Sequence, residues 1–128
     1  MSNPPRGNGI AGVDVGASLC KLVLSGESES RARRFPSSDL RGVRACLGEW
    51  KPERVIATGG GAARLERELA HLRVHTVPEF AAWARGAPLL AAREGLDLPD
   101  HYLLVSLGTG TSVLSLEGGS ARRVGGSA

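Results

Sequence analysis

Two glycine-rich segments stand where the chain could approach a phosphate group. One, from 58 to 62, follows a short apolar run and contains three consecutive glycines, and the other, from 108 to 112, interrupts the apolar stretch from Val105 to Ser115. Glycine permits tight turns and close backbone approach, and successive N–H groups in such turns can bind an anion. Taken alone, an ordinary hairpin is the commoner explanation of the second segment. The first lacks the Walker lysine and the GxGxxG spacing, so it only suggests a phosphate loop.

Two charged residues interrupt the apolar runs near the amino terminus. Asp14 lies at the end of the run from Ile10 to Val15, and Lys21 lies within the run from Leu19 to Leu24. A carboxylate in this position could hold Mg²⁺ or its water ligands, and an inward-facing ammonium group would need an anionic partner. The structural alternatives stay open, because Asp often forms turns and strand alternation would permit Lys21 to face solvent.

Glu79 follows Pro78 at the predicted start of a helix, where a carboxylate could act as a general base. The helix dipole alone would also favour a carboxylate there. The three histidines have no mutual metal-ligand spacing. Cys20 and Cys46 lie in apolar and helical patterns, so we expect buried, reduced thiols and a cytoplasmic protein.

The elements that must position these residues alternate between strands and helices. We predict three helices, at about 39–50, 62–72 and 78–94. The predicted strands are 10–15, 19–24, 31–35, 55–57, 74–77, 102–107, 111–116 and 121–124. This order indicates the α/β class, with helices packed on a mixed sheet.

The same order predicts the domain organisation. We predict a flexible tail at residues 1–9 and a first domain at 10–98. Residues 99–128 are predicted to form the opening hairpin of a truncated second domain that resembles the first. In this division, no helix covers the strands of the second domain. We therefore expect unpaired apolar strands that favour self-association or a partner chain.

Composition narrows the classes of function. The chain has 128 residues, 41% hydrophobic and 23% charged, with a formal net charge of +3. These values are typical of a globular domain. With only 4% aromatic residues and scattered basic residues, apart from short stretches such as Arg31 to Arg34, nucleic acid is not an expected partner. Neither a signal peptide nor a membrane span is visible, so no membrane partner is expected.

Five segments in this order resemble the type II pantothenate kinases of the acetate and sugar kinase, Hsc70 and actin superfamily. They are GVDVGASLCKLVL, IATGGGA, VPEFAAWARGAPLL, YLLVSLGTGTSVLSL and ARRVGGSA, and together they cover nearly all of 10–128. The resemblance implies a ribonuclease H-like (actin-like ATPase) domain with a mixed five-stranded sheet and flanking helices. It also implies ATP-dependent phosphorylation of pantothenate to 4'-phosphopantothenate, the first step of coenzyme A biosynthesis, with ATP and Mg²⁺ as cofactors.

The resemblance also implies roles for individual residues. Glu79 matches the catalytic base, and Asp14 matches the residue that serves magnesium. Ser112 and Arg123 match substrate-binding positions. The resemblance implies that Arg123 binds the pantothenate carboxylate. The remaining matches are to the two phosphate motifs, the first with Asp14, Gly16, Ser18 and Lys21, the second with Gly108, Thr109, Gly110 and Thr111.

The chain departs from the family pattern in two places. Gly16-Ala17-Ser18 stands where the family usually has Gly-Gly-Thr, so the loss of a glycine predicts a slightly different turn. The chain also ends at Ala128, before the family's adenosine-binding loop. We therefore expect a truncated kinase, with activity of this chain alone an open question and a homodimer or a complementing chain as candidate partners. Two alternatives stay open: a related sugar or carboxylate kinase, and a non-catalytic nucleotide- or partner-binding remnant.

Overall fold

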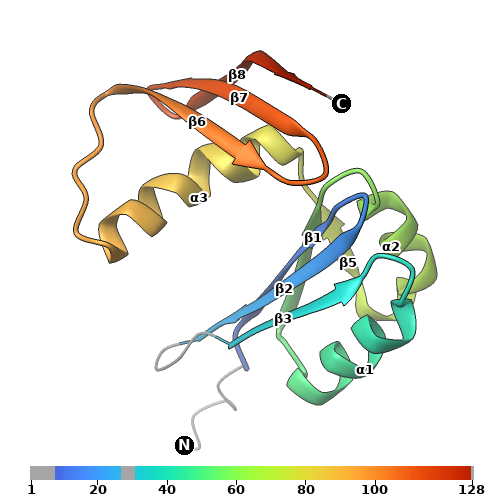
Figure 1. Cartoon of the computed structure of the whole chain (residues 1–128). Helices are drawn as coiled ribbons and strands as arrows, with labels where there is room; N and C mark the ends of the chain where they lie inside the picture. The colour runs from blue at the N-terminus through green and yellow to red at the C-terminus, as the bar shows by residue number, and fades with distance from the viewer. Residues whose placement is uncertain (1–7, 27–30, 128) are drawn as a thin grey trace, which may run out of the picture. The chain divides into compact units, whose positions relative to one another are not determined.

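The computed structural model describes residues 8–26 and 31–127, which form two compact units. The first is Met1–Val77 and the second is Pro78–Ala128, and each contains one sheet (Figure 1). Residues 1–7 of the predicted tail lie outside the described residues.

The sheet of the first unit has five strands in the order β3-β2-β1-β4-β5. β2 runs antiparallel to both β1 and β3, whereas β4 runs parallel to both β1 and β5. The mixed five-stranded sheet that we expected is therefore confirmed. The strand bounds are β1 Ile10–Val15, β2 Leu19–Ser25, β3 Arg31–Pro36, β4 Arg54–Thr58 and β5 Val74–Thr76.

One face of this sheet forms the core with α1 (Leu40–Trp50) and α2 (Ala62–Glu68). Residues alternate along each strand, so Ala11, Val13 and Val15 of β1 point into this core and are at most 5% exposed. The residues between them point to the other face, which α1 and α2 do not cover. That second face carries Asp14 and Lys21.

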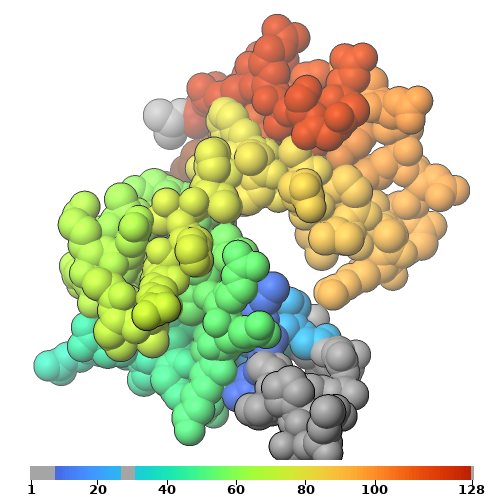
Figure 2. Space-filling model, turned by 180° about the vertical axis from the view of Figure 1, so that it is seen from behind, coloured from blue at the N-terminus to red at the C-terminus, as the bar shows by residue number. Residues whose placement is uncertain are grey.

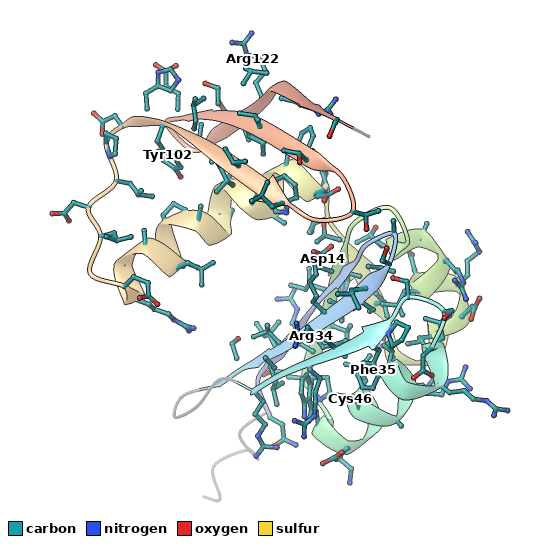
Figure 3. All side chains as sticks on the ribbon, viewed as in Figure 1. Asp14, Arg34, Phe35, Cys46, Tyr102 and Arg122 are labelled. Atoms are coloured by element: carbon teal, nitrogen blue, oxygen red, sulfur yellow. The ribbon has the colours of Figure 1, made fainter. Side chains whose placement is uncertain are left out.

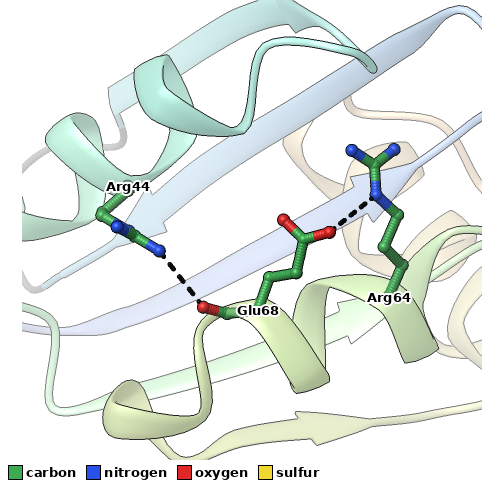
Figure 4. A network of polar contacts seen from close by, with 3 residues as sticks. All are labelled: Arg44, Arg64 and Glu68. Atoms are coloured by element: carbon green, nitrogen blue, oxygen red, sulfur yellow. Dashed lines mark hydrogen bonds and ion pairs between the residues drawn. The ribbon is translucent and has the colours of Figure 1, made fainter.

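The two helices of this unit also meet through polar groups at the surface (Figure 4). Arg44 Nη2 donates a hydrogen bond to the Glu68 carbonyl oxygen at 3.3 Å, and Arg64 pairs with the Glu68 carboxylate at 3.1 Å. Exposed ion pairs of this kind contribute about 0–1 kcal/mol. The apolar core, rather than this network, therefore fixes the helices on the sheet.

The predicted helix over 62–72 is divided in the structure. α2 ends at Glu68, and a separate 3-10 turn, η1, spans Ala70–Leu72. The division occurs at Leu69, whose φ of −114° leaves the helical range. Arg73 then adopts a left-handed φ of 49°, which turns the chain into β5.

The second unit consists of a three-stranded antiparallel sheet and one helix. The helix, α3, packs Ala84 against Leu114 and Leu116, and the rings of Phe80 and Trp83 lie 5.7 Å apart beside this cluster. Figure 2 shows α3 lying along the sheet of this unit. Our expectation that no helix covers these strands is wrong, because α3 is amphipathic and places its apolar side on β7. The element bounds are α3 Glu79–Arg93, β6 His101–Leu107, β7 Thr111–Glu117 and β8 Ser120–Ser127.

The compact units divide between Val77 and Pro78, whereas the sequence placed a domain boundary after residue 98. The difference arises because α3 packs on the second sheet. The antiparallel order β6-β7-β8 repeats that of β1-β2-β3. That these strands begin a second domain of the same kind stays a prediction.

α3 has 15 residues and is the longest helix that the structure describes. A helix needs about 20 mostly apolar residues to cross a bilayer. Accordingly, none of the helices in 8–26 and 31–127 is both long and apolar enough to span a membrane.

Candidate functional site

The structure brings Asp14 and Lys21 together on the uncovered face of the first sheet. The two residues are directly opposed in the β1–β2 register, and Lys21 Nζ lies 3.5 Å from Asp14 Oδ2. Their side chains are 31% and 51% exposed, respectively, so both remain accessible. A cation and a carboxylate placed in this way can bind a phosphate group and a metal ion next to each other.

The second carboxylate oxygen of Asp14 has a different environment. Asp14 Oδ1 is buried and has no hydrogen-bond partner among the described residues. An unsatisfied buried acceptor costs about 1–3 kcal/mol or more when charged. A bound cation or ordered water at Oδ1 would remove this cost.

Gly59 is the residue that lies against this oxygen. Its φ of +94° is a conformation that glycine adopts readily, and a Cβ atom there would lie 2.8 Å from Asp14 Oδ1 and 2.5 Å from the Val15 carbonyl oxygen. Glycine is therefore required here for both its backbone conformation and its small size. The first glycine-rich segment thus approaches Asp14 more closely than a residue with a side chain would permit.

The N–H groups of Gly61 and Ala62 in the same segment are already bonded within the chain. The Gly61 N–H donates to the Val15 carbonyl oxygen at 3.1 Å, and a Cβ on Gly61 would collide with the Val15 side chain. Thr58 Oγ1 donates to the Val77 carbonyl oxygen at 2.9 Å. The segment therefore serves close packing of α2 on β1, which is the structural alternative to a phosphate loop.

The residues around Asp14 fit a magnesium ion. Within 8–26 and 31–127, no group of three or more His, Cys, Asp or Glu side chains could hold a metal by itself. Mg²⁺ commonly takes only one or two carboxylates and fills its remaining positions with water and substrate phosphates. Asp14, through its unpartnered Oδ1, is the residue that would hold the ion.

The β1–β2 turn closes without strain despite its unusual sequence. The Gly16 N–H donates to the Leu19 carbonyl oxygen at 3.0 Å, and Ser37 contacts both the Gly16 and Ser18 carbonyl oxygens. None of the residues 16–18 has a positive φ. Ala17 is therefore compatible with this turn. That the turn differs slightly from the family's turn stays a prediction.

Cys20 lies next to Asp14 along the sheet but on the core side. Burial and, as the smaller cause, the negative charge of Asp14 together raise the pKa of the Cys20 thiol to about 11. Burial likewise raises the pKa of Cys46. Both thiols are free, buried and protonated at neutral pH, as the sequence indicated, and neither can act as a nucleophile there.

In the second unit, Glu79 is the first residue of α3. It is half-buried, and its side chain makes no hydrogen bond or ion pair with any described residue. Pro78 caps the helix in an extended conformation, which leaves the carboxylate at the positive end of the helix dipole. Figure 1 places this end of α3 and the β6–β7 turn at the same end of the unit.

The β6–β7 turn contains the second glycine-rich segment. The strands pair up to Leu107 and Thr111, and the Gly108 N–H donates to the Gly110 carbonyl oxygen at 2.9 Å across the turn. A Cβ on Gly108 would meet no atom closer than 3.8 Å, and its φ is not positive. The turn therefore does not itself require glycine at 108, and the missing side chain leaves open space at the tip beside Thr109.

The structure also brings Ser112 and Arg123 together. Gly126 is opposite Ser112, and a Cβ on Gly126 would lie 2.6 Å from Arg123 Nη2 and 3.1 Å from the Ser112 Cα. A β-bulge in this part of β8 places Arg123 opposite Leu114 and leaves Val124 as the extra residue. Bulges commonly re-aim side chains in this way. Gly126, with a φ of +140°, permits the arrangement and was missed by the sequence analysis.

Arg34 was not identified as a site residue from the sequence, where it is only part of a basic stretch. The β2–β3 register places Arg34 directly opposite Lys21. In Figure 3, Arg34 and Asp14 lie on one side of the sheet, with Phe35 and Cys46 on the other. Strand alternation could have predicted which residues of β3 share a face, but not which residue of β2 each one meets.

Comparison with known proteins shows what this chain resembles. No model of a protein family matches the sequence. Over 115 residues, however, the chain is 30% identical to proteins named type II pantothenate kinase from Staphylococcus aureus, including strains USA300 and NCTC 8325. The chain is therefore similar in sequence to one part of these kinases. The match covers 90% of this chain, which spans only 42% of the length of those relatives.

Two solved structures are similar to the chain in fold. One is the activator of 2-hydroxyisocaproyl-CoA dehydratase from Clostridium difficile, solved with bound ADPNP. It has a TM-score of 0.63 and 17% sequence identity, and the match covers 91% of this chain and 44% of the activator chain. The other is a candidate 2-dehydro-3-deoxygalactonokinase from Sinorhizobium meliloti. It has a TM-score of 0.54 and 17% sequence identity, and the match covers 92% of this chain and 52% of the kinase chain. The chain has the actin-like ATPase fold.

The conformation of Gly59 generates a stability prediction. Replacing Gly59 by Ala forces a side chain into a left-handed conformation against Asp14 and Val15. We expect Gly59→Ala to lower the free energy of unfolding by about 1–3 kcal/mol. Gly60→Ala is the matched control, because a Cβ at Gly60 meets nothing within 4 Å. Urea unfolding followed by circular dichroism measures both, and equal stability of the two variants would contradict this account of Gly59.

Proposed function

We propose that this chain forms part of an ATP-dependent kinase that phosphorylates pantothenate to 4'-phosphopantothenate. The observation that carries the proposal is the 30% identity to proteins named type II pantothenate kinase over 90% of the chain. The actin-like ATPase fold supports it, since one of the similar structures was solved with the nucleotide ADPNP.

In the first unit, Asp14 and Lys21 have the charges that nucleotide binding requires. Lys21 would bind phosphate oxygens, while Asp14 would hold Mg²⁺ through Oδ1. A bound Mg²⁺ would neutralise charge on the phosphates. Phosphoryl transfer depends mainly on positioning and charge neutralisation, so a fixed cation next to a metal-binding carboxylate suits this chemistry. Gly16 and Ser18 would shape the turn that carries these strands.

In the second unit, the β6–β7 turn would receive a further phosphate group. Gly108 leaves the tip open to a ligand. The residues that we assign to this contact are Gly108, Thr109, Gly110 and Thr111. Backbone N–H groups and hydroxyl groups are suitable donors to phosphate oxygens.

Glu79 would act as the general base. Its carboxylate would accept the proton of the pantothenate hydroxyl as that oxygen forms a bond to the γ-phosphorus of ATP. The bond between that phosphorus and the bridging oxygen breaks, and ADP leaves with the electron pair. The half-buried position of Glu79 and its lack of an ion-pair partner in the described residues favour this role.

Arg123 and Ser112 would bind the carboxylate end of pantothenate. The guanidinium group of Arg offers two parallel N–H donors, which match the two oxygens of a carboxylate. The close approach of Arg123 to Gly126 and Ser112 supports a binding position that a side chain at 126 would obstruct.

The Glu79→Gln variant tests the proposed reaction. The full polypeptide that the gene encodes is assayed for phosphoryl transfer from ATP, with pantothenate and N-acetylglucosamine as competing acceptors. We expect transfer to pantothenate, and we expect Glu79→Gln to reduce it by about 100- to 10,000-fold, because an amide cannot accept the proton. ATP affinity should change little.

Glu94→Gln is the control for this experiment, since it removes the same charge at the other end of α3. Turnover of Glu79→Gln close to that of the unsubstituted protein would show that Glu79 only stabilises the helix. Transfer to N-acetylglucosamine alone would indicate a different kinase of the same fold. ATP binding without transfer to either acceptor would indicate a non-catalytic nucleotide-binding protein.

Arg123 and Arg122 form a second matched pair. Arg123 is opposite Leu114 on the side of the sheet that faces α3, whereas Arg122 is opposite Ser115 and points away from α3 (Figure 3). We expect Arg123→Ala to raise the KM for pantothenate by roughly 10-fold or more, and Arg122→Ala to leave it unchanged. Steady-state kinetics at saturating ATP measures both, and equal effects would refute the assignment of Arg123.

A further inference from the structure

A row of charged residues crosses the uncovered face of the first sheet. The β1–β2 register pairs Asp14 with Lys21, and the β2–β3 register pairs Lys21 with Arg34. Directly opposed residues of antiparallel strands project from the same face, with their Cβ atoms about 4.5–5.5 Å apart. Arg34 therefore lies beside Lys21 on the side of the sheet that carries Asp14 (Figure 3).

The charges in this row do not balance. Lys21 is paired with Asp14 at 3.5 Å, whereas the exposed Arg34 side chain makes no ion pair or hydrogen bond with any residue of the described ranges. Two like charges directly opposite each other across a pair of strands are destabilising. A bound anion with several oxygens would relieve this repulsion, because it could contact both cations at once.

We propose that Arg34 joins Lys21 in binding a phosphate group of the nucleotide. This inference rests on the proposed function, since it takes the nucleotide to bind beside Asp14. Lys21 would act as a point charge, and Arg34 would add a planar fork that bonds two oxygens of one phosphate. Arg34 is thus a specificity-determining residue for the polyphosphate chain.

The neighbouring residue on β3 provides a matched control. Arg33 is opposite Leu22, so its side chain projects from the other face of the sheet, toward the side where α1 packs. Both arginines are exposed on the same strand. Arg33→Gln and Arg34→Gln therefore remove the same net charge, and only the second removes a cation from the face that carries Asp14.

The experiment is calorimetric titration of the full polypeptide that the gene encodes, first with Mg²⁺-ATP and then with tripolyphosphate. We expect Arg34→Gln to weaken binding of both ligands by roughly 10-fold, the effect of losing one charged hydrogen bond. Arg33→Gln should leave both affinities unchanged. Arg34→Lys should recover part of the loss, because it restores the charge without the fork.

Each outcome of this titration is decisive. Equal losses in the two glutamine variants would overturn the inference, since the effect would then reflect net charge alone. An unchanged affinity in Arg34→Gln, or no binding of either ligand by the unsubstituted protein, would also overturn it. If Arg34→Gln selectively loses binding of ATP and tripolyphosphate but the unsubstituted protein never phosphorylates pantothenate, the inference stands and the proposed function fails. Thermal unfolding of all three variants verifies that each is folded. If Arg34→Gln is unstable, the affinities of Arg34→Lys for ATP and tripolyphosphate are used instead, and unchanged affinities would overturn the inference.

Discussion

A carboxylate with one buried, unpartnered oxygen lies near the end of β1, and the surrounding residues are arranged around it. Asp14 Oδ2 faces Lys21 across the hairpin, while Oδ1 is buried beside the left-handed Gly59. The apolar residues on either side of Asp14 point into the core, so the strand cannot shift by one residue without burying the charge. The packing of the first unit thus holds Asp14 on the uncovered face.

The second unit positions its candidate residues by different means. α3 packs its apolar side on β7, which fixes the half-buried Glu79 at the beginning of the helix. A β-bulge and the left-handed Gly126 allow Arg123 to fold toward Ser112. Because the helix and the strands share one small core, the spacing among these residues depends on the packing of Leu114 and Leu116.

Strand alternation and turn chemistry made much of the fold predictable from the sequence. The apolar runs and the proline before α3 marked elements that the structure contains. The placement of α3 was not predicted, since no local pattern in the sequence indicates on which sheet its apolar side packs. In the structure α3 packs against Leu114 and Leu116.

The candidate site was predictable only in part. Asp14 and Lys21 were identifiable as charges within apolar strands, because such charges need a partner. Arg34 and Gly126 were not, since their importance depends on register and on a bulge that no local pattern indicates. The catalytic and substrate-binding assignments of Glu79, Ser112 and Arg123 stay predictions.

The most direct test of the account is the effect of Mg²⁺ on ATP affinity in the unsubstituted protein and in Asp14→Asn. If Asp14 Oδ1 holds the metal ion, Mg²⁺ should strengthen ATP binding by the unsubstituted protein and should have little effect on the variant. In EDTA, Asp14→Asn should bind ATP at least as tightly as the unsubstituted protein, because the carboxylate repels the phosphates when no metal is present. The same strengthening by Mg²⁺ in both proteins would contradict the account, since the metal would then bind independently of Asp14.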